Sequence, residues 1–116
     1  MKRNQMLEIA VRALASKKAV ELQAVEVTDI TVLADYFLFV SGTSSTHIKT
    51  LAEETEFQLE QAGVRPHHIE GRATGWILLD YGSLVIHVFQ QEQRQFYGLD
   101  KLWADGKPVD LTPWLD

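Results

Sequence analysis

Cysteine is absent from the 116-residue chain, and proline is scarce, with only three residues. Without cysteine there is neither a disulfide framework nor a thiolate zinc site, which fits a protein that works in a reducing compartment. No stretch approaches the roughly 20 apolar residues that a membrane span requires. The basic N-terminal segment also lacks the apolar run of a secretory signal. These absences predict a cytoplasmic protein with no membrane partner.

Basic residues are outnumbered, since 11 Lys and Arg stand against 16 Asp and Glu, for a net charge of −5. This balance argues against nucleic acid as the main partner, because duplex binding uses Lys and Arg to neutralise phosphates. The basic residues are concentrated in residues 1–18, whereas residues 70–116 are acidic. An acidic C-terminal half attracts a basic partner, and the basic N-terminus leaves RNA contact as a secondary option. A surface whose charge only maintains solubility would account for the same balance.

Hydrophobic residues make up 46% of the chain, which is enough for one domain over residues 1–116 with a real core. Helical periodicity predicts helices over residues 3–17 and 46–62, and residues 91–103 fit a helix interrupted at Gly98. Apolar or alternating runs predict strands over residues 20–27, 35–42, 67–71, 76–81 and 84–89. Residues 28–34 are ambiguous, and a turn-rich tail covers about 104–116. The order predicts an α/β domain with a single mixed β-sheet and flanking helices.

The second predicted helix has recognisable ends. Thr43, Ser44 and Ser45 are all N-cap candidates, and Gly63 stands where a left-handed residue ends a helix. Free N–H groups at the Gly42–Ser45 turn could bind a phosphate, but the spacing of a P-loop is missing. Capping is therefore the predicted role of this turn. Phe57 lies opposite the apolar stripe of the helix, so it is either exposed or covered by a second layer.

The segment GWILLDYGSLVIHVF, residues 75–89, predicts a β-hairpin with a two-residue turn at Gly82 and Ser83. One face then pairs Tyr81 with Leu84, Leu79 with Ile86, and Ile77 with Val88, and is the core face. The other face pairs Asp80 with Val85, Leu78 with His87, and Trp76 with Phe89. This second face is too apolar for a solvated face and too polar for a simple core. Either a helix or the tail covers it, with His87 and Asp80 satisfied by local hydrogen bonds, or it is a partly exposed binding patch anchored by Trp76 and Phe89.

Patterns for catalysis and metal binding are weak. Asp80 stands alone on its strand, whereas phosphoryl transfer by metal ions needs two or three carboxylates close together. His67 and His68 are adjacent, so on a strand they point to opposite faces. Ser44 lacks the Gly-x-Ser-x-Gly context of a hydrolase nucleophile. We therefore expect no enzyme activity, no cofactor and no metal, and we keep a nucleotidyltransferase-type enzyme as the catalytic alternative.

A set of short motifs resembles the ribosomal silencing factor family, also called Iojap-like. The motifs are ADYF at 34–37, SGTSS at 41–45, EG at 70–71, GW at 75–76, LDYG at 79–82, HVF at 87–89 and Glu92-x-Arg94-x-x-Tyr97-x-Leu99-Asp100-x-Leu102-Trp103. The resemblance covers about residues 5–105, and its specificity comes from the order and spacing of the motifs. Asp100 stands where the family often has Glu, a departure that keeps the charge.

The resemblance implies a non-catalytic factor with a nucleotidyltransferase-like fold that lacks catalytic carboxylates. Members bind the large ribosomal subunit through its fourteenth protein, block joining of the small subunit, and lower translation when nutrients are scarce. Organellar relatives are linked to large-subunit assembly. For this chain we expect the partner-binding residues to be Trp76, Leu78, Asp80, His87, Phe89, Arg94 and Tyr97. In an alternative reading Arg94 pairs with Glu92 or Asp100 and Tyr97 belongs to the core. A generic interaction domain or a homodimer formed through the aromatic patch is the other alternative.

Overall fold

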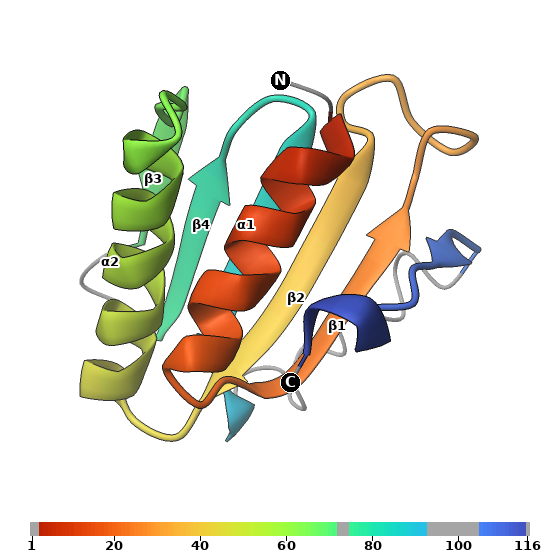
Figure 1. The fold of residues 1–116 in the computed structure, drawn as a ribbon. Helices are drawn as coiled ribbons and strands as arrows, with labels where there is room; N and C mark the ends of the chain where they lie inside the picture. The colour runs from red at the N-terminus through yellow and green to blue at the C-terminus, as the bar shows by residue number, and fades with distance from the viewer. Residues whose placement is uncertain (1–2, 72–74, 93–104, 116) are drawn as a thin grey trace.

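Two helices pack on one face of a single sheet in the computed structural model, which describes residues 3–71, 75–92 and 105–115 (Figure 1). The helices are α1 (Arg3–Ser16) and α2 (Ser45–Gln61). The strands are β1 (Val20–Glu26), β2 (Tyr36–Gly42), β3 (His68–Glu70), β4 (Trp76–Asp80), β5 (Leu84–Gln90) and β6 (Lys107–Pro108), and a 3-10 turn, η2 (Thr112–Trp114), follows β6. The predicted α/β class with one mixed sheet is confirmed.

The sheet has the strand order β3-β4-β5-β2-β1-β6. Strands β2 and β5 run parallel, and the other neighbouring pairs are antiparallel. All seven residues of β2 are buried, as its continuous apolar sequence predicts for a strand covered on both faces. The centre of the sheet is therefore the most protected part of the fold.

The main core lies between the helices and the sheet. Its fully buried members include Leu7 and Leu14 of α1, Ile48, Leu51 and Leu59 of α2, and Ile77, Leu79, Ile86 and Val88 of the hairpin. These hairpin residues form the face that the sequence predicts as core. Burying each such side chain contributes about 2 kcal/mol, so the stacking of two helices on the sheet accounts for much of the stability.

The ends of α2 follow the predicted chemistry. The Oγ of Ser44 accepts a hydrogen bond of 3.0 Å from the backbone N–H of His47, which makes Ser44 the N-cap among the three candidates. Gly63 follows the helix with φ +83°, a conformation that costs glycine little. Phe57 is 53% exposed, so its position on the outer side of the helix is open to solvent.

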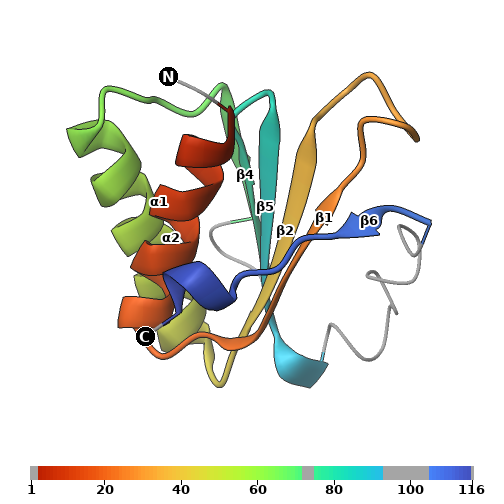
Figure 2. The same cartoon turned by 45° about the vertical axis from the view of Figure 1, so that its right-hand side comes forward.

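The C-terminal tail, predicted only as turn-rich, extends the sheet and closes the core. β6 pairs with the end of β1, and the N–H of Val109 donates a hydrogen bond of 3.0 Å to the carbonyl of Ala24. Leu111 and Trp114 then pack against the main core beside α1 (Figure 2). A strand of two residues carries no periodicity, so its pairing with β1 cannot be predicted locally.

Two further segments, residues 28–34 and residues 91–103, carry expectations from the sequence. The ambiguous residues 28–34 form a loop that connects β1 to β2. Of the helix predicted over residues 91–103, Gln91 and Glu92 are helical, and the remainder, including Gly98, lies outside the described residues. Over the three described ranges, neither helix is long and apolar enough to cross a membrane.

A candidate protein-binding face of the sheet

The hairpin of β4 and β5 has the register that its sequence predicts. Trp76 pairs with Phe89, Leu78 with His87, and Asp80 with Val85. Gly82 opens the two-residue turn with φ +83°, and the N–H of Tyr81 donates a bond of 2.8 Å to the carbonyl of Leu84. This positive φ favours glycine, and a Cβ on this residue would lie 2.9 Å from Cε1 of the exposed His67, whose side chain would have to move. The turn therefore fixes which side chains share the second face.

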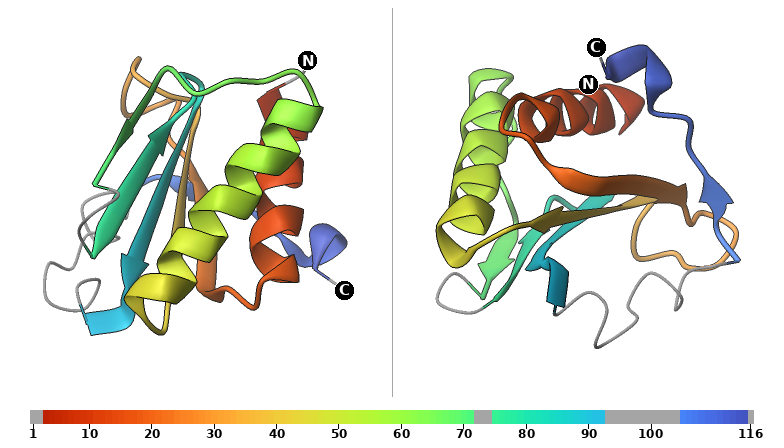
Figure 3. Two further views of the ribbon diagram at one scale, coloured as in Figure 1. Left: turned by 90° about the vertical axis from the view of Figure 1, so that its left-hand side faces the viewer. Right: turned by 90° about the horizontal axis from the view of Figure 1, so that it is seen from below.

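That second face lies on the side of the sheet opposite α1 and α2 (Figure 3). Its buried cluster consists of Val25, Val27, Ala34, Phe37, Phe39 and Phe89, with Trp76 and Val85 packed against it. We call the aromatic face the set Phe37, Phe39, Trp76, Leu78, Asp80, Val85, His87 and Phe89. Phe37 and Phe39 were not among the predicted site residues. Their alternation in β2 places both on one face, but the unbroken apolar run around them hides this signal.

The rings of the aromatic face form a continuous array. The imidazole of His87 stacks on Phe39, with ring centroids 5.1 Å apart and planes inclined by 20°. Phe37 meets the same imidazole edge-on at 5.5 Å, and Trp76 lies 6.0 Å from it. Trp76 also packs on Phe89 at 6.1 Å. Such offset and edge contacts favour a rigid apolar surface with a fixed position for each ring.

His87 is the unusual member of this array. Both of its ring nitrogens are buried, and among the residues that the structure describes neither has a hydrogen-bond partner. Burial lowers the pKa of the imidazole from 6.5 to about 4, because the charged form would lose its hydration. The ring is therefore neutral at neutral pH. Over the described ranges, His87 therefore lacks the local hydrogen bond that the covered-face alternative expects for it.

The other predicted site residues differ in how far they reach solvent. Trp76, Leu78 and Asp80 are half-buried, as His87 is, whereas Phe89 is completely buried and packs against Phe39 and Trp76. Asp80 has a local role, because its Oδ1 accepts a bond of 2.8 Å from the N–H of Gly82. Arg94 and Tyr97 lie outside the described residues.

The remaining polar clusters have structural partners. His47 fastens α2 to the end of α1, since its Nε2 lies 2.8 Å from the carbonyl oxygen of Lys17, and its Nδ1 accepts from the N–H of Thr43. His68 and Glu70 meet at 2.6 Å on the exposed edge strand β3. Within the described part of the chain, no group of three or more His, Asp or Glu side chains is arranged to hold a metal ion.

Comparisons with known proteins agree on one family. Residues 1–115 match the family described as "Ribosomal silencing factor during starvation". The ribosomal silencing factor RsfS of Bacillus subtilis is 35% identical over 112 residues, which cover 96% of this chain and 95% of that protein. A mouse protein named "Mitochondrial assembly of ribosomal large subunit protein 1" is 32% identical over 84% of this chain and 45% of its own length.

The fold is shared as well. A crystal structure of a protein from Chromobacterium violaceum superposes with a TM-score of 0.86 and 28% sequence identity, over 89% of this chain and 87% of that one. Sequence and structure therefore agree over nearly the entire length, and the chain belongs to the ribosomal silencing factor family.

Proposed function

We propose that this protein represses translation by binding the large ribosomal subunit through its fourteenth protein, with the aromatic face as the contact. In this position it would block joining of the small subunit, especially when nutrients are limiting. It acts in the cytoplasm by occupying a surface and not by catalysis. Membership of the silencing-factor family supports the biological role.

The observation that carries the proposal is the composition of the aromatic face. Helices α1 and α2 cover only the opposite side of the sheet (Figure 3). On the aromatic face Trp76 and Leu78 are half-buried, and they stand beside the polar groups of Asp80 and His87. Protein interfaces favour this combination, in which aromatic anchors supply most of the energy and a few polar groups set the orientation.

Charge supports a protein partner over RNA as the principal contact. The chain carries a net charge of −5, and Asp80 places a carboxylate on the face itself. A basic ribosomal protein is attracted to such a surface, whereas ribosomal RNA is repelled by it. RNA contact is therefore secondary in the proposal and is confined to the basic N-terminal segment.

Sedimentation with purified large subunits, small subunits and joined ribosomes tests the proposal. The wild-type protein should pellet with large subunits, and Trp76→Ala should weaken this binding by more than about 1 kcal/mol, roughly fivefold in affinity. Phe57→Ala is the matched control, because it removes an exposed aromatic side chain on α2, on the other side of the molecule. Absence of the wild-type protein from every ribosomal pellet would refute the proposal.

A role in assembling the large subunit is the second candidate, and the name of the mouse relative favours it. The two roles differ in the particle that is bound. A silencing factor should bind mature large subunits and prevent their joining, whereas a factor devoted to assembly should prefer immature precursors. Sedimentation with both kinds of particle separates the two functions.

A further inference from the structure

The loop between β1 and β2 presents apolar side chains to solvent. Val32 is 100% exposed, Leu33 81% and Ile30 43%. We call residues 28–33 the apolar loop. Single exposed apolar side chains are common on protein surfaces, but three within four consecutive positions form a patch that costs solubility and is typical of an interaction site. The proposed contact through the aromatic face does not include this patch.

Hydrogen bonds hold the apolar loop in a defined conformation. At its base the N–H of Val27 donates 2.8 Å to the carbonyl of Asp35, and the carbonyl of Val27 accepts from Ile30 and Thr31 at 3.0 Å. Within the loop the N–H of Leu33 donates to the Oγ1 of Thr31. These bonds arrange the exposed side chains before any partner arrives, which lowers the entropy cost of binding.

The apolar loop borders the aromatic face. Val27 and Ala34, the residues that flank the loop, belong to the same buried cluster as Phe37 and Phe39. Seen along the sheet, the loop lies on the side away from α1 (Figure 3, right). Its position is at the start of β2, whereas Trp76 pairs with Phe89 near the end of β2. The loop and Trp76 are thus at opposite ends of the face, separated by roughly 15–20 Å along the strands.

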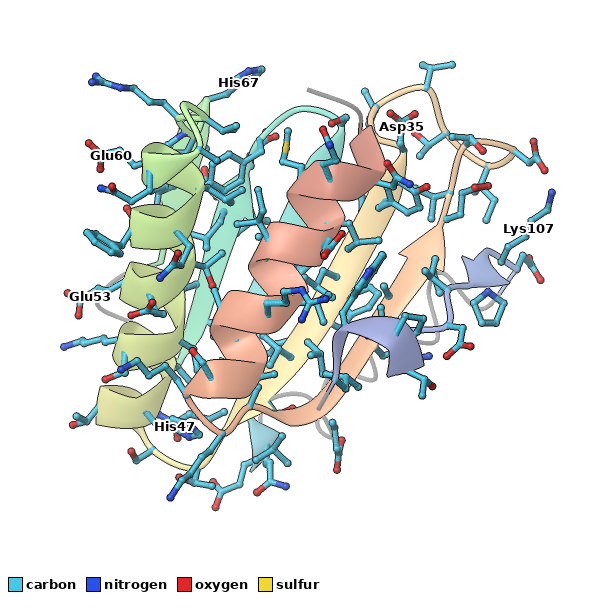
Figure 4. All side chains as sticks on the ribbon, viewed as in Figure 1. Asp35, His47, Glu53, Glu60, His67 and Lys107 are labelled. Atoms are coloured by element: carbon cyan, nitrogen blue, oxygen red, sulfur yellow. The ribbon has the colours of Figure 1, made fainter. Side chains whose placement is uncertain are left out.

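The charges around the apolar loop define the chemistry of its partner. Asp29 lies on the loop, and Asp35 lies at its base, as labelled in Figure 4. Lys107 of β6 is paired with Asp29 at 3.1 Å, and this hydrogen bond raises the pKa of the ammonium group. Lys107 offsets the charge of Asp29, so this ion pair gives the tip no excess positive charge to attract anionic lipid or RNA phosphates. On a chain with a net charge of −5, such an apolar tip fits an apolar recess of a basic protein.

We infer that the apolar loop is a second anchor for the basic ribosomal protein bound by the aromatic face. This inference rests on the proposed function and adds a specific contact to it. Val32 and Leu33 enter an apolar recess of the partner, while Trp76 contacts the partner at the far end of the sheet. Two anchors at the ends of one face fix the orientation of the protein as well as its affinity, and orientation determines whether the bound protein obstructs the small subunit.

The double variant Val32→Ser, Leu33→Ser tests the inference. Both side chains are exposed, so the melting temperature should stay close to that of the wild-type protein. Binding to large subunits should weaken by at least about tenfold, because two anchor side chains are lost. Phe57→Ser is the matched control, since it makes the same kind of change at a 53% exposed residue on α2, and it should bind like the wild type.

Each alternative outcome has a distinct signature. If the wild-type protein and Phe57→Ser bind large subunits and Trp76→Ala binds weakly, but the double variant binds within twofold of the wild type, the aromatic face stands and the loop anchor is refuted. If the wild-type protein binds no large subunits, the proposed function itself fails. Light scattering tests whether the loop binds a second copy of the chain instead. If the double variant loses self-association but still binds large subunits, the loop is a self-association site and the inference is overturned.

Discussion

The imidazole of His87 stacks on the ring of Phe39 in the centre of the aromatic face, with centroids 5.1 Å apart. Among the described residues, Phe37 and Trp76 are its other ring neighbours, and neither carries a charge. A histidine in this position serves the fold only while it is neutral. Acid should therefore weaken the same surface that we propose binds the ribosome.

The stability of the protein should depend on the protonation of His87. The unfolded chain binds a proton below pH 6.5, whereas the folded imidazole resists protonation until about pH 4. Above pH 6.5 His87 is neutral in both states and its protonation does not affect the free energy of unfolding. As the pH falls from 6.5 to 4, protonation of the unfolded chain lowers the free energy of unfolding by up to about 3 kcal/mol. Urea unfolding of the wild type and His87→Phe across this range measures it. The stability of the variant relative to the wild type should rise as the pH falls.

His68→Gln serves as the control for that experiment, because it removes an exposed histidine on β3. A constant difference in unfolding free energy between the wild type and His87→Phe from pH 7 to pH 4 would contradict the assignment. It would mean that His87 is protonated as readily in the folded protein as in the unfolded chain.

The cap of α2 offers a paired test of local structure. Ser44→Ala removes the acceptor for the N–H of His47 and should lower the unfolding free energy by about 1 kcal/mol. Ser45→Ala, one residue further on at an exposed helical position, should have a much smaller effect. Equal losses in thermal or urea unfolding of the two variants would show that Ser44 is not the cap.

Asp80 has two roles that substitution can separate. Asp80→Asn keeps an oxygen that can accept from the N–H of Gly82, so stability should change little, but the charge offered to a basic partner is lost. Asp80→Ala also removes the acceptor and should cost about 1 kcal/mol of stability in addition. Binding to large subunits should fall for both variants. Full binding by Asp80→Asn would confine this residue to the turn.

Phe89 tests whether the aromatic face is built on a packed layer. Its side chain is completely buried, between Phe39 and Trp76, so Phe89→Ala should destabilise the protein by about 3–5 kcal/mol. Phe57→Ala removes the same group at an exposed site and should remain within about 0.5 kcal/mol of the wild type. Similar melting temperatures for the two variants would contradict the burial of Phe89.

Local sequence patterns predict the hairpin and the helices well. The alternation on both sides of Gly82 and Ser83 determines the register of β4 and β5, because a shift by one residue would expose Leu79 and Ile86. The apolar stripe from Ile48 to Leu59 likewise places α2 on the sheet. In both cases the information lies within a few residues of the element that it specifies.

Features that depend on distant contacts were harder to predict. The pairing of β6 with β1 joins residues about 80 positions apart, and nothing in Lys107 or Pro108 indicates a strand. The sequence leaves residues 28–34 ambiguous, and the exposure of Val32 and Leu33 is seen only in the structure. The pattern of the hairpin indicates that His87 is unusual, but its contacts with the rings of Phe37 and Phe39, which come from another strand, could not be read from the hairpin itself.

Subunit joining is the most direct test of the central claim. Purified large and small subunits are mixed with or without the protein, and the fraction of joined ribosomes is measured by sucrose-gradient sedimentation. The wild-type protein should lower that fraction in proportion to its occupancy of large subunits, and Phe57→Ala should act like the wild type. An unchanged fraction of joined ribosomes, at concentrations where the protein saturates the large subunit, would contradict the proposed mechanism.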